Sequence, residues 1–179
     1  MAQRPWVSFF SQTGSEIVNI SEAIGRWPDV IITNERPEHL RKINEKLLER
    51  EIVTLPNKPA LVDYEQALSR FENPLITLHG WLRIVPEEVA DEFEIYNGHP
   101  GLITLYPDLK GKDPQVRAWE ANYKTVGSVI HKVTVGVDEG PVIMQRAYTF
   151  ENLPMLSTMY EVLHNVSTDL WIKFLRERL

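Results

Sequence analysis

The segment WVSFF at residues 6–10 leads directly into SQTGSE at residues 11–16, and the same order of elements recurs along the N-terminal half. The first segment is a short apolar run typical of a buried strand, and the second is a turn that opens a helix. Two further runs rich in β-branched residues, at residues 29–33 and 52–55, and an apolar run at 74–78 alternate with helical patterns at 37–50 and 60–72. This alternation predicts an α/β fold, with a Rossmann-like, mostly parallel sheet and helices on both faces.

The second half of the chain changes character. Residues 93–96 are expected to form a strand, residues 114–121 a short helix, and residues 126–133 and 142–150 two further strands. Residues 156–179 form an amphipathic pattern, with one apolar stripe at Met159, Leu163, Val166, Leu170 and Phe174. We expect this C-terminal helix to pack on the sheet and to close a single domain over residues 1–179.

Composition excludes several classes of protein. The 179 residues carry a formal charge of −6 and 43% apolar residues, which is ordinary for a globular protein and unlike a general nucleic-acid binder. No apolar run is long enough to span a membrane, and the N-terminus lacks the pattern of a secretory signal, so a cytoplasmic protein is expected. The absence of Cys excludes disulfides, thiolate metal sites and a Cys nucleophile.

The segment YNGHPG at residues 96–101 is the first candidate site. Pro100 biases His99 toward extended backbone, in which residues two apart point the same way. The Asn97 amide and the His99 imidazole would then project together from the end of a strand, where they could stabilise an oxyanion and move a proton at an acyl centre. The alternative is an Asn that caps its own loop beside a surface His.

The segment VGVDEGP at residues 135–141 is the second candidate. A carboxylate held in this turn could pair with His99, raise its pKa and orient its ring. The alternative is an ordinary turn, because Asp, Glu, Gly and Pro favour turns in any protein.

These two segments, together with LHGWLRI at residues 78–84 and GSVIH at residues 127–131, resemble the motifs of one family. The chain is similar to folate-dependent formyltransferases, chiefly phosphoribosylglycinamide formyltransferases and, further off, the catalytic domain of methionyl-tRNA formyltransferases. The family patterns are L-A-G-F-M-R-I-L, N-x-H-P-S-L, G-x-x-V-H and L-D-x-G-P-I-I, and this chain has them in the same order.

The resemblance implies transfer of a formyl group from 10-formyltetrahydrofolate to a primary amine, by direct attack and without a metal. Asn97, His99 and Asp138 match the catalytic Asn, His and Asp. The residues implied to bind the folate donor are Trp81, Leu82, Arg83, Val85, His131, Val135, Gly136 and Val137. Two alternatives remain, namely hydrolysis of the same donor and a folate- or nucleotide-binding module without activity.

The acceptor side departs from the family. Thr13, Gly14, Ser15 and Glu16 match the substrate-binding loop, but the family's S-G-N-G-S-N is SQTGSE here. A carboxylate at residue 16 would repel the substrate phosphate, or it could simply be an acid favoured by the helix dipole. The acceptor is therefore left as an amine on a small molecule, such as a nucleotide or an amino sugar. A tRNA acceptor is not expected, because no additional C-terminal domain follows.

The histidines divide into three groups. His131 could border the donor site or pack within its strand. His79 could line the donor pocket or be a satisfied core residue. His39 and His164 are expected at the surface.

Overall fold

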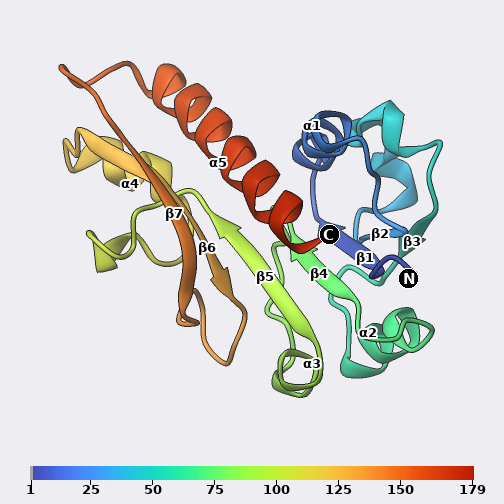
Figure 1. Ribbon diagram of the computed structural model, residues 1–179. Coiled ribbons are helices and arrows are strands. Elements are labelled where there is room, and N and C mark those ends of the chain that lie inside the picture. The colour runs from blue at the N-terminus through green and yellow to red at the C-terminus, as the bar shows by residue number, and fades with distance from the viewer. Residues whose placement is uncertain (1) are drawn as a thin grey trace.

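A computed structural model describes residues 2–179, apart from the side chains of residues 37, 40 and 41. It contains one seven-stranded sheet with the order β3-β2-β1-β4-β5-β6-β7 (Figure 1). The strands are β1 (Trp6–Phe10), β2 (Val30–Thr33), β3 (Ile52–Thr54), β4 (Leu75–Leu78), β5 (Glu94–His99), β6 (Thr125–Lys132) and β7 (Val142–Thr149). The helices are α1 (Ser15–Ile24), α2 (Leu61–Leu68), α3 (Glu87–Glu92), α4 (Pro114–Glu120) and α5 (Leu156–Arg178).

Strands β1 to β5 are parallel to one another, β6 is antiparallel to β5, and β7 is antiparallel to β6. This confirms the predicted mostly parallel α/β sheet. The parallel strands β1, β2 and β4 are buried along their whole length, as expected for a layer covered on both faces. Because strands β1, β4 and β5 end at the same edge, the loops that follow them meet there.

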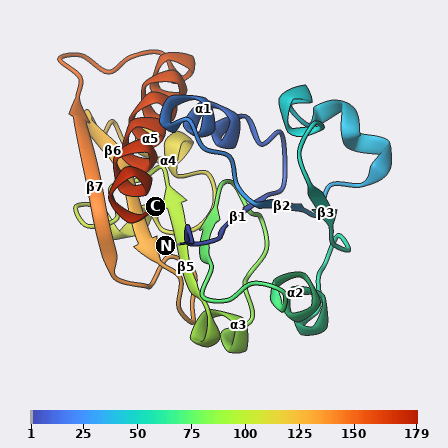
Figure 2. The same cartoon turned by 45° about the vertical axis from the view of Figure 1, so that its right-hand side comes forward.

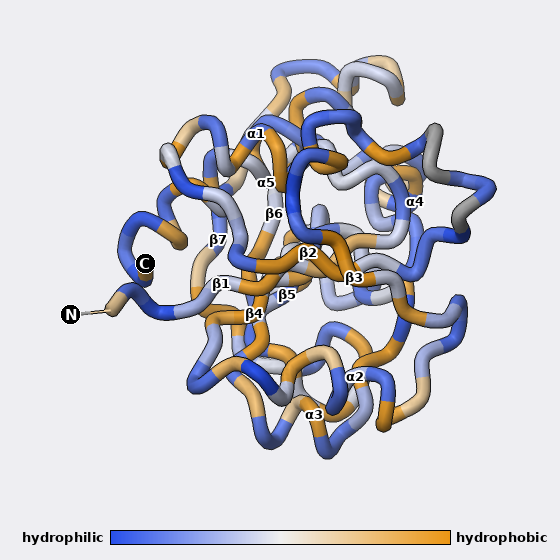
Figure 3. The backbone as a smooth tube through the Cα atoms, turned by 90° about the vertical axis from the view of Figure 1, so that its right-hand side faces the viewer, coloured by the Kyte–Doolittle hydropathy of each residue, from blue (hydrophilic) through white to orange (hydrophobic). Residues whose placement is uncertain are grey.

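Helices cover both faces of the sheet. Figure 3 shows α1 and α5 on one side of the strands and α2 and α3 on the other, with the most apolar segments in the middle layer. The core under α2 and α3 contains Phe9, Tyr64 and Val89. The core under α5 contains Trp6, Tyr96 and Phe174. Figure 2 shows α1 and α5 next to each other, so the first and last helices share one face.

The predicted helix over residues 37–50 is wrong. Two short 3₁₀ segments, Pro37–Lys42 and Glu45–Leu47, occupy this region instead. Asn44 separates them, because its side chain accepts a hydrogen bond from the Lys46 backbone (3.1 Å) and its own backbone N–H donates to the Thr13 carbonyl (2.8 Å). Asn favours such local bonds over a continuous helix.

Other boundaries differ less. Helix α3 was not predicted, since it has only six residues, and α2 ends earlier than residue 72. Strand β5 extends to His99, whereas the sequence placed its end near residue 96. In residues 2–179 no helix combines the length and the apolar character needed to cross a lipid bilayer.

Gly98 allows the C-terminal helix to close on the sheet. A Cβ atom at this position would lie 2.5 Å from Nε1 of Trp171, a fully buried residue of α5. Trp171 also packs against the His79 ring, with centroids 4.6 Å apart. Only glycine therefore lets the indole lie against β5 between the sheet and the helix.

Replacing Gly98 by Ala should destabilise the protein by about 1–3 kcal/mol, because a well-packed interior resists an added methyl group. Urea unfolding measures the loss. The variant Trp171→Phe offers the control, since a phenyl ring has no Nε1 to collide with the new methyl group. Gly98→Ala should cost less in the Trp171→Phe background, and an equal cost in both backgrounds would contradict this packing.

Candidate active site

Strand β5 presents alternate residues to opposite sides of the sheet. Asn97 and His99 lie on the same face, and Gly98 faces α5 through Trp171. The extended backbone predicted for His99 before Pro100 is thus observed. The two side chains do project from the end of this strand in the same direction.

The turn between β6 and β7 holds Asp138 in an unusual backbone conformation. Its φ of 55° lies in the left-handed region, and the preceding Gly136 has a φ of 95°. Gly140 is also required, because a Cβ there would lie 1.6 Å from the Lys132 carbonyl oxygen. The segment is therefore a turn, as one sequence interpretation held, and this turn also directs the Asp138 carboxylate toward His99.

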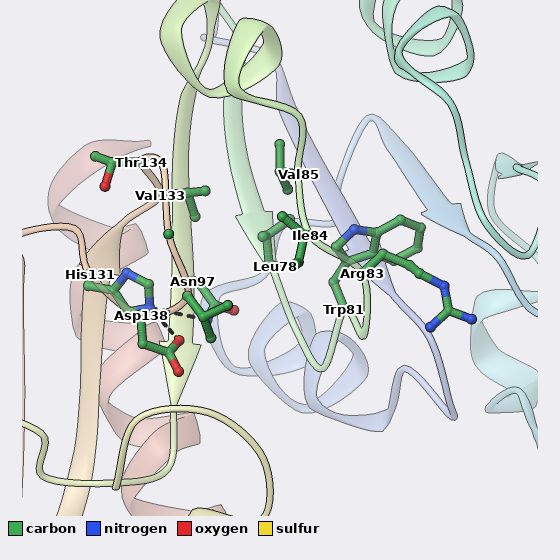
Figure 4. A pocket seen from close by; sticks show the side chains of 12 residues that line it. Leu78, Trp81, Arg83, Ile84, Val85, Asn97, His131, Val133, Thr134 and Asp138 are labelled. Atoms are coloured by element: carbon green, nitrogen blue, oxygen red, sulfur yellow. Dashed lines mark hydrogen bonds and ion pairs between the residues drawn. The ribbon is translucent and has the colours of Figure 1, made fainter. Parts of the chain in front are cut away.

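The Asp138 carboxylate lies close to His99 and His131. Its Oδ2 lies 3.3 Å from Nδ1 of His99 and accepts a hydrogen bond from the Gly111 backbone N–H (2.8 Å). Its Oδ1 lies 3.2 Å from Nε2 of His131, which in turn lies 3.2 Å from Nδ2 of Asn97. The structure thus brings Asn97, His99 and Asp138 together, with His131 between the amide and the carboxylate. Figure 4 shows Asn97, His131 and Asp138 of this group at one end of a pocket.

His99 is oriented from both sides of its ring. Its Nε2 donates to the Leu109 carbonyl (2.8 Å), so neutral His99 has a bare Nδ1 toward Asp138. A proton added at Nδ1 would form a charge-assisted bond to the carboxylate. His99 is only 5% exposed, so it acts on the pocket through Asp138 rather than by direct contact.

The pKa of His99 is lowered, in contrast to the increase predicted from the sequence. Burial disfavours the charged ring and is the largest influence, and the nearby Asp138 carboxylate only partly offsets it. For Asp138, burial raises the pKa, but the hydrogen bond from His131, the charge on His99 and the Gly111 N–H together bring it below the usual 3.8. Asp138 is therefore ionised at neutral pH.

A first cavity of about 120 Å³ opens beside Asn97. Its wall contains, from the predicted donor residues, Trp81, Arg83, Val85, His131, Gly136 and Val137, and additionally Leu78, Ile84, Val133, Thr134, Asn97 and Asp138. Figure 4 shows Trp81 and Arg83 at the end away from Asp138. Leu82 and Val135 do not line this cavity, and both are more than half exposed. Ile84 and Thr134 are neighbours of predicted residues, so the motifs already marked both segments.

A second cavity of about 310 Å³ lies on the α5 side of β5. All four residues predicted for the acceptor line it, namely Thr13, Gly14, Ser15 and Glu16. His79 also lines this cavity and not the donor pocket, and its side chain is buried and hydrogen-bonded. His164, expected as a plain surface residue, is exposed but faces the same cavity. Ser167 was missed, because nothing in the helical pattern of α5 distinguishes it.

Comparison with known proteins gives the family. The sequence model of the family described as formyl transferase matches residues 32–175. This chain belongs to the formyl transferase family. The formyl transferase motifs recognised in the sequence, apart from the loop at residues 11–16, lie within the matched segment.

Individual relatives include both formyltransferases and formyltetrahydrofolate deformylases. The chain is 31% identical over 109 residues to a phosphoribosylglycinamide formyltransferase of Bacillus subtilis, covering 58% of this chain and 54% of the relative. It is 34% identical over 74 residues to a formyltetrahydrofolate deformylase of a Corynebacterium species, covering 40% of this chain and 25% of the relative. The chain thus spans about half or less of the length of these curated relatives.

The fold has close structural neighbours as well. A crystal structure of glycinamide ribonucleotide transformylase 1 from Geobacillus kaustophilus superposes with a TM-score of 0.82. The superposition covers 98% of each chain at 23% identity, and it shows that the two proteins share this fold. Among residues 2–179, no group of three or more His, Asp or Glu side chains is arranged to hold a metal ion.

The titration of His99 is open to a direct test by NMR. Its midpoint should lie below 6.5, and Asp138→Asn should lower it further, because the carboxylate favours the protonated ring. Since the folded formyl transferase binds this proton less readily than the unfolded chain, the stability that depends on His99 is lost as the pH falls below 6.5. Spectra of His99→Gln assign the resonance. A midpoint above 6.5 would contradict the dominant effect of burial, and an upward shift in Asp138→Asn would contradict the effect of the carboxylate on this ring.

Proposed function

We propose that this chain transfers the formyl group of 10-formyltetrahydrofolate to a primary amine of a small molecule. The observation that carries the proposal is the meeting of the Asn97 amide and the Asp138 carboxylate at the wall of the first cavity. A hydrogen-bond donor for the developing oxyanion and a negative charge beside the attacking amine are the two groups on which this proposed transfer depends.

The first cavity has the chemistry of a folate site. Most of its wall is apolar, with Trp81, Val85 and Val133 available to contact a flat heteroaromatic ring. Arg83 lies on the rim and donates to Asn57, which leaves a cation near the opening. A formyl group attached to such a ring system would then lie toward Asn97 and Asp138 at the other end of the cavity.

The residues act on one developing charge. As the amine nitrogen attacks the formyl carbon, the carbonyl oxygen becomes an oxyanion, to which Asn97 donates an N–H. The amide carries two N–H groups, and because Nε2 of His131 donates to Asp138 it does not accept from Asn97, so these N–H groups remain available to the oxygen. The attacking nitrogen becomes positive and is stabilised by the Asp138 carboxylate. When the bond between the formyl carbon and the folate nitrogen breaks, the proton lost by the amine passes to that nitrogen.

The histidines hold Asp138 in place for this step. His99 and His131 each contact one oxygen of the carboxylate, at 3.3 and 3.2 Å, and the Gly111 N–H adds a third contact. The bonds from His131 and the Gly111 N–H keep the carboxylate ionised and limit its rotation, and His99 adds a bond when its Nδ1 is protonated, so the charge is preorganised before the substrates bind. We assign His99 a positioning role and Asn97 and Asp138 direct roles.

The acceptor would enter from the second cavity. Asn97 lines the first cavity and its neighbour Gly98 lines the second, so the two cavities lie on opposite faces of β5. Thr13, Gly14, Ser15 and Glu16 would bind the acceptor there. The amine and the donor would meet at the carboxyl end of this strand.

Hydrolysis of the same donor is the second candidate. The deformylase relative favours it, because the same three side chains could activate water in place of an amine. Product analysis separates the two functions. Formate released from 10-formyltetrahydrofolate at an undiminished rate without any amine would favour hydrolysis, and a formylated amine favours transfer.

Asn97→Ala should reduce kcat by about two to three decades, because one oxyanion donor is lost, while donor affinity changes little. The absorbance of released tetrahydrofolate gives the rate, and titration with the donor gives the affinity. The control is Asn152→Ala, which makes the same change at an exposed position outside both cavities. Unchanged turnover in Asn97→Ala with every amine tested would favour a binding module without activity.

A further inference from the structure

The charged side chains in the wall of the second cavity restrict the ligands that it can bind. Among the side chains that the structure describes, its wall carries one carboxylate, two imidazoles and no Lys or Arg. The carboxylate is Glu16, and the imidazoles are His79 and His164. Glu16 remains 21% exposed, so a ligand in the cavity can reach it.

A chain of buried hydrogen bonds ends at Glu16. The indole N–H of Trp6 donates to the Thr77 hydroxyl (2.9 Å), and that hydroxyl lies 2.8 Å from Nε2 of His79. On the other side of the ring, Nδ1 of His79 lies 2.9 Å from Oε1 of Glu16. Because the Trp6 indole can only donate, the consistent direction runs from Trp6 through Thr77 and His79, and the carboxylate is the final acceptor.

The other oxygen of Glu16 is bound as well. Ser167 of α5 donates to Oε2 at 3.0 Å. Burial raises the pKa of Glu16, but the hydrogen bond and charge of His79, with Ser167 and His164, together lower it below 4.5. The side chain therefore remains a carboxylate and is held rigidly at the wall of the cavity.

Glu16 also changes what the start of α1 can bind. It lies in the first turn of this helix, where the helix dipole favours a negative group. In this chain the Glu16 carboxylate is the negative group at this position. A phosphate brought to the same place would face the carboxylate without a described Lys or Arg to offset the repulsion.

We propose that this cavity selects a phosphate-free, hydroxylated amine, whose hydroxyl group donates to Glu16. This inference rests on the proposed formyl transfer and specifies its acceptor. Glu16 accepts from the substrate hydroxyl with its remaining lone pairs, while His79 and Ser167 keep it in place. Tyr160, which is 41% exposed and lines the same cavity, offers an aromatic face to a sugar ring.

Glucosamine and glucosamine 6-phosphate form a matched pair of probes, since they differ only in the phosphate. Calorimetric titration of the intact protein should show glucosamine binding at least about tenfold more tightly, a difference that corresponds to one charge-assisted interaction or one repulsion. Glu16→Gln keeps the shape of the side chain, and should remove most of this preference. The control is Glu22→Gln, which removes the same charge from an exposed position on the same helix and should leave the preference unchanged.

Equal or tighter binding of the phosphorylated amine to the wild-type protein would overturn the proposal, as would a preference that survives in Glu16→Gln. Failure of both amines to bind at 50-fold molar excess and millimolar concentration would also overturn it. The proposed function fails differently. Glucosamine that binds with the expected preference but is never formylated would support the proposed selectivity of the cavity. The same result would contradict the proposed transfer reaction.

Discussion

The contacts of the Asp138 carboxylate are the constraint on which the candidate site depends. Its two oxygens face a backbone N–H and two imidazoles that come from β5, β6 and the loop before α4. The left-handed backbone at Asp138 and the glycine at residue 140 exist to aim this side chain at that point. A single buried carboxylate thus ties together segments that are far apart in the sequence, and its charge is compensated by hydrogen bonds rather than by a Lys or Arg.

Strand β5 separates two environments. On one face Asn97 borders an apolar cavity that ends at Asp138, and on the other Gly98 borders a polar cavity whose wall contains Glu16. Each cavity therefore has its own carboxylate with its own hydrogen-bond partners. Asp138 serves the reaction in the proposed mechanism, whereas Glu16 serves selection of the acceptor. Trp171 of α5 packs against Gly98, and this contact fixes the position of α5 relative to β5.

The sequence predicts the sheet and the proximity of Asn97, His99 and Asp138, because both rest on recognisable segments. Apolar runs between turns locate the strands, and the Pro after His99 places its side chain on the same face as Asn97. The link between Glu16 and His79 could not be predicted, since the two residues are 63 positions apart and nothing local connects them. The lowered pKa of His99 was missed for a related reason: the neighbouring carboxylate is visible in a motif, but the depth of burial is not. The 3₁₀ segments around Asn44 depend on a contact with the Thr13 loop, which the charged helical pattern concealed.

The most direct measurement is a crystal structure of this protein with a stable analogue of 10-formyltetrahydrofolate. We predict that the ring system occupies the cavity beside Trp81 and that the formyl oxygen lies within hydrogen-bond distance of the Asn97 amide, about 3 Å. The Asp138 carboxylate should keep its contacts with both imidazoles in that complex. An analogue bound in the cavity beside Glu16, or a formyl group directed away from Asn97 and Asp138, would contradict the proposed site.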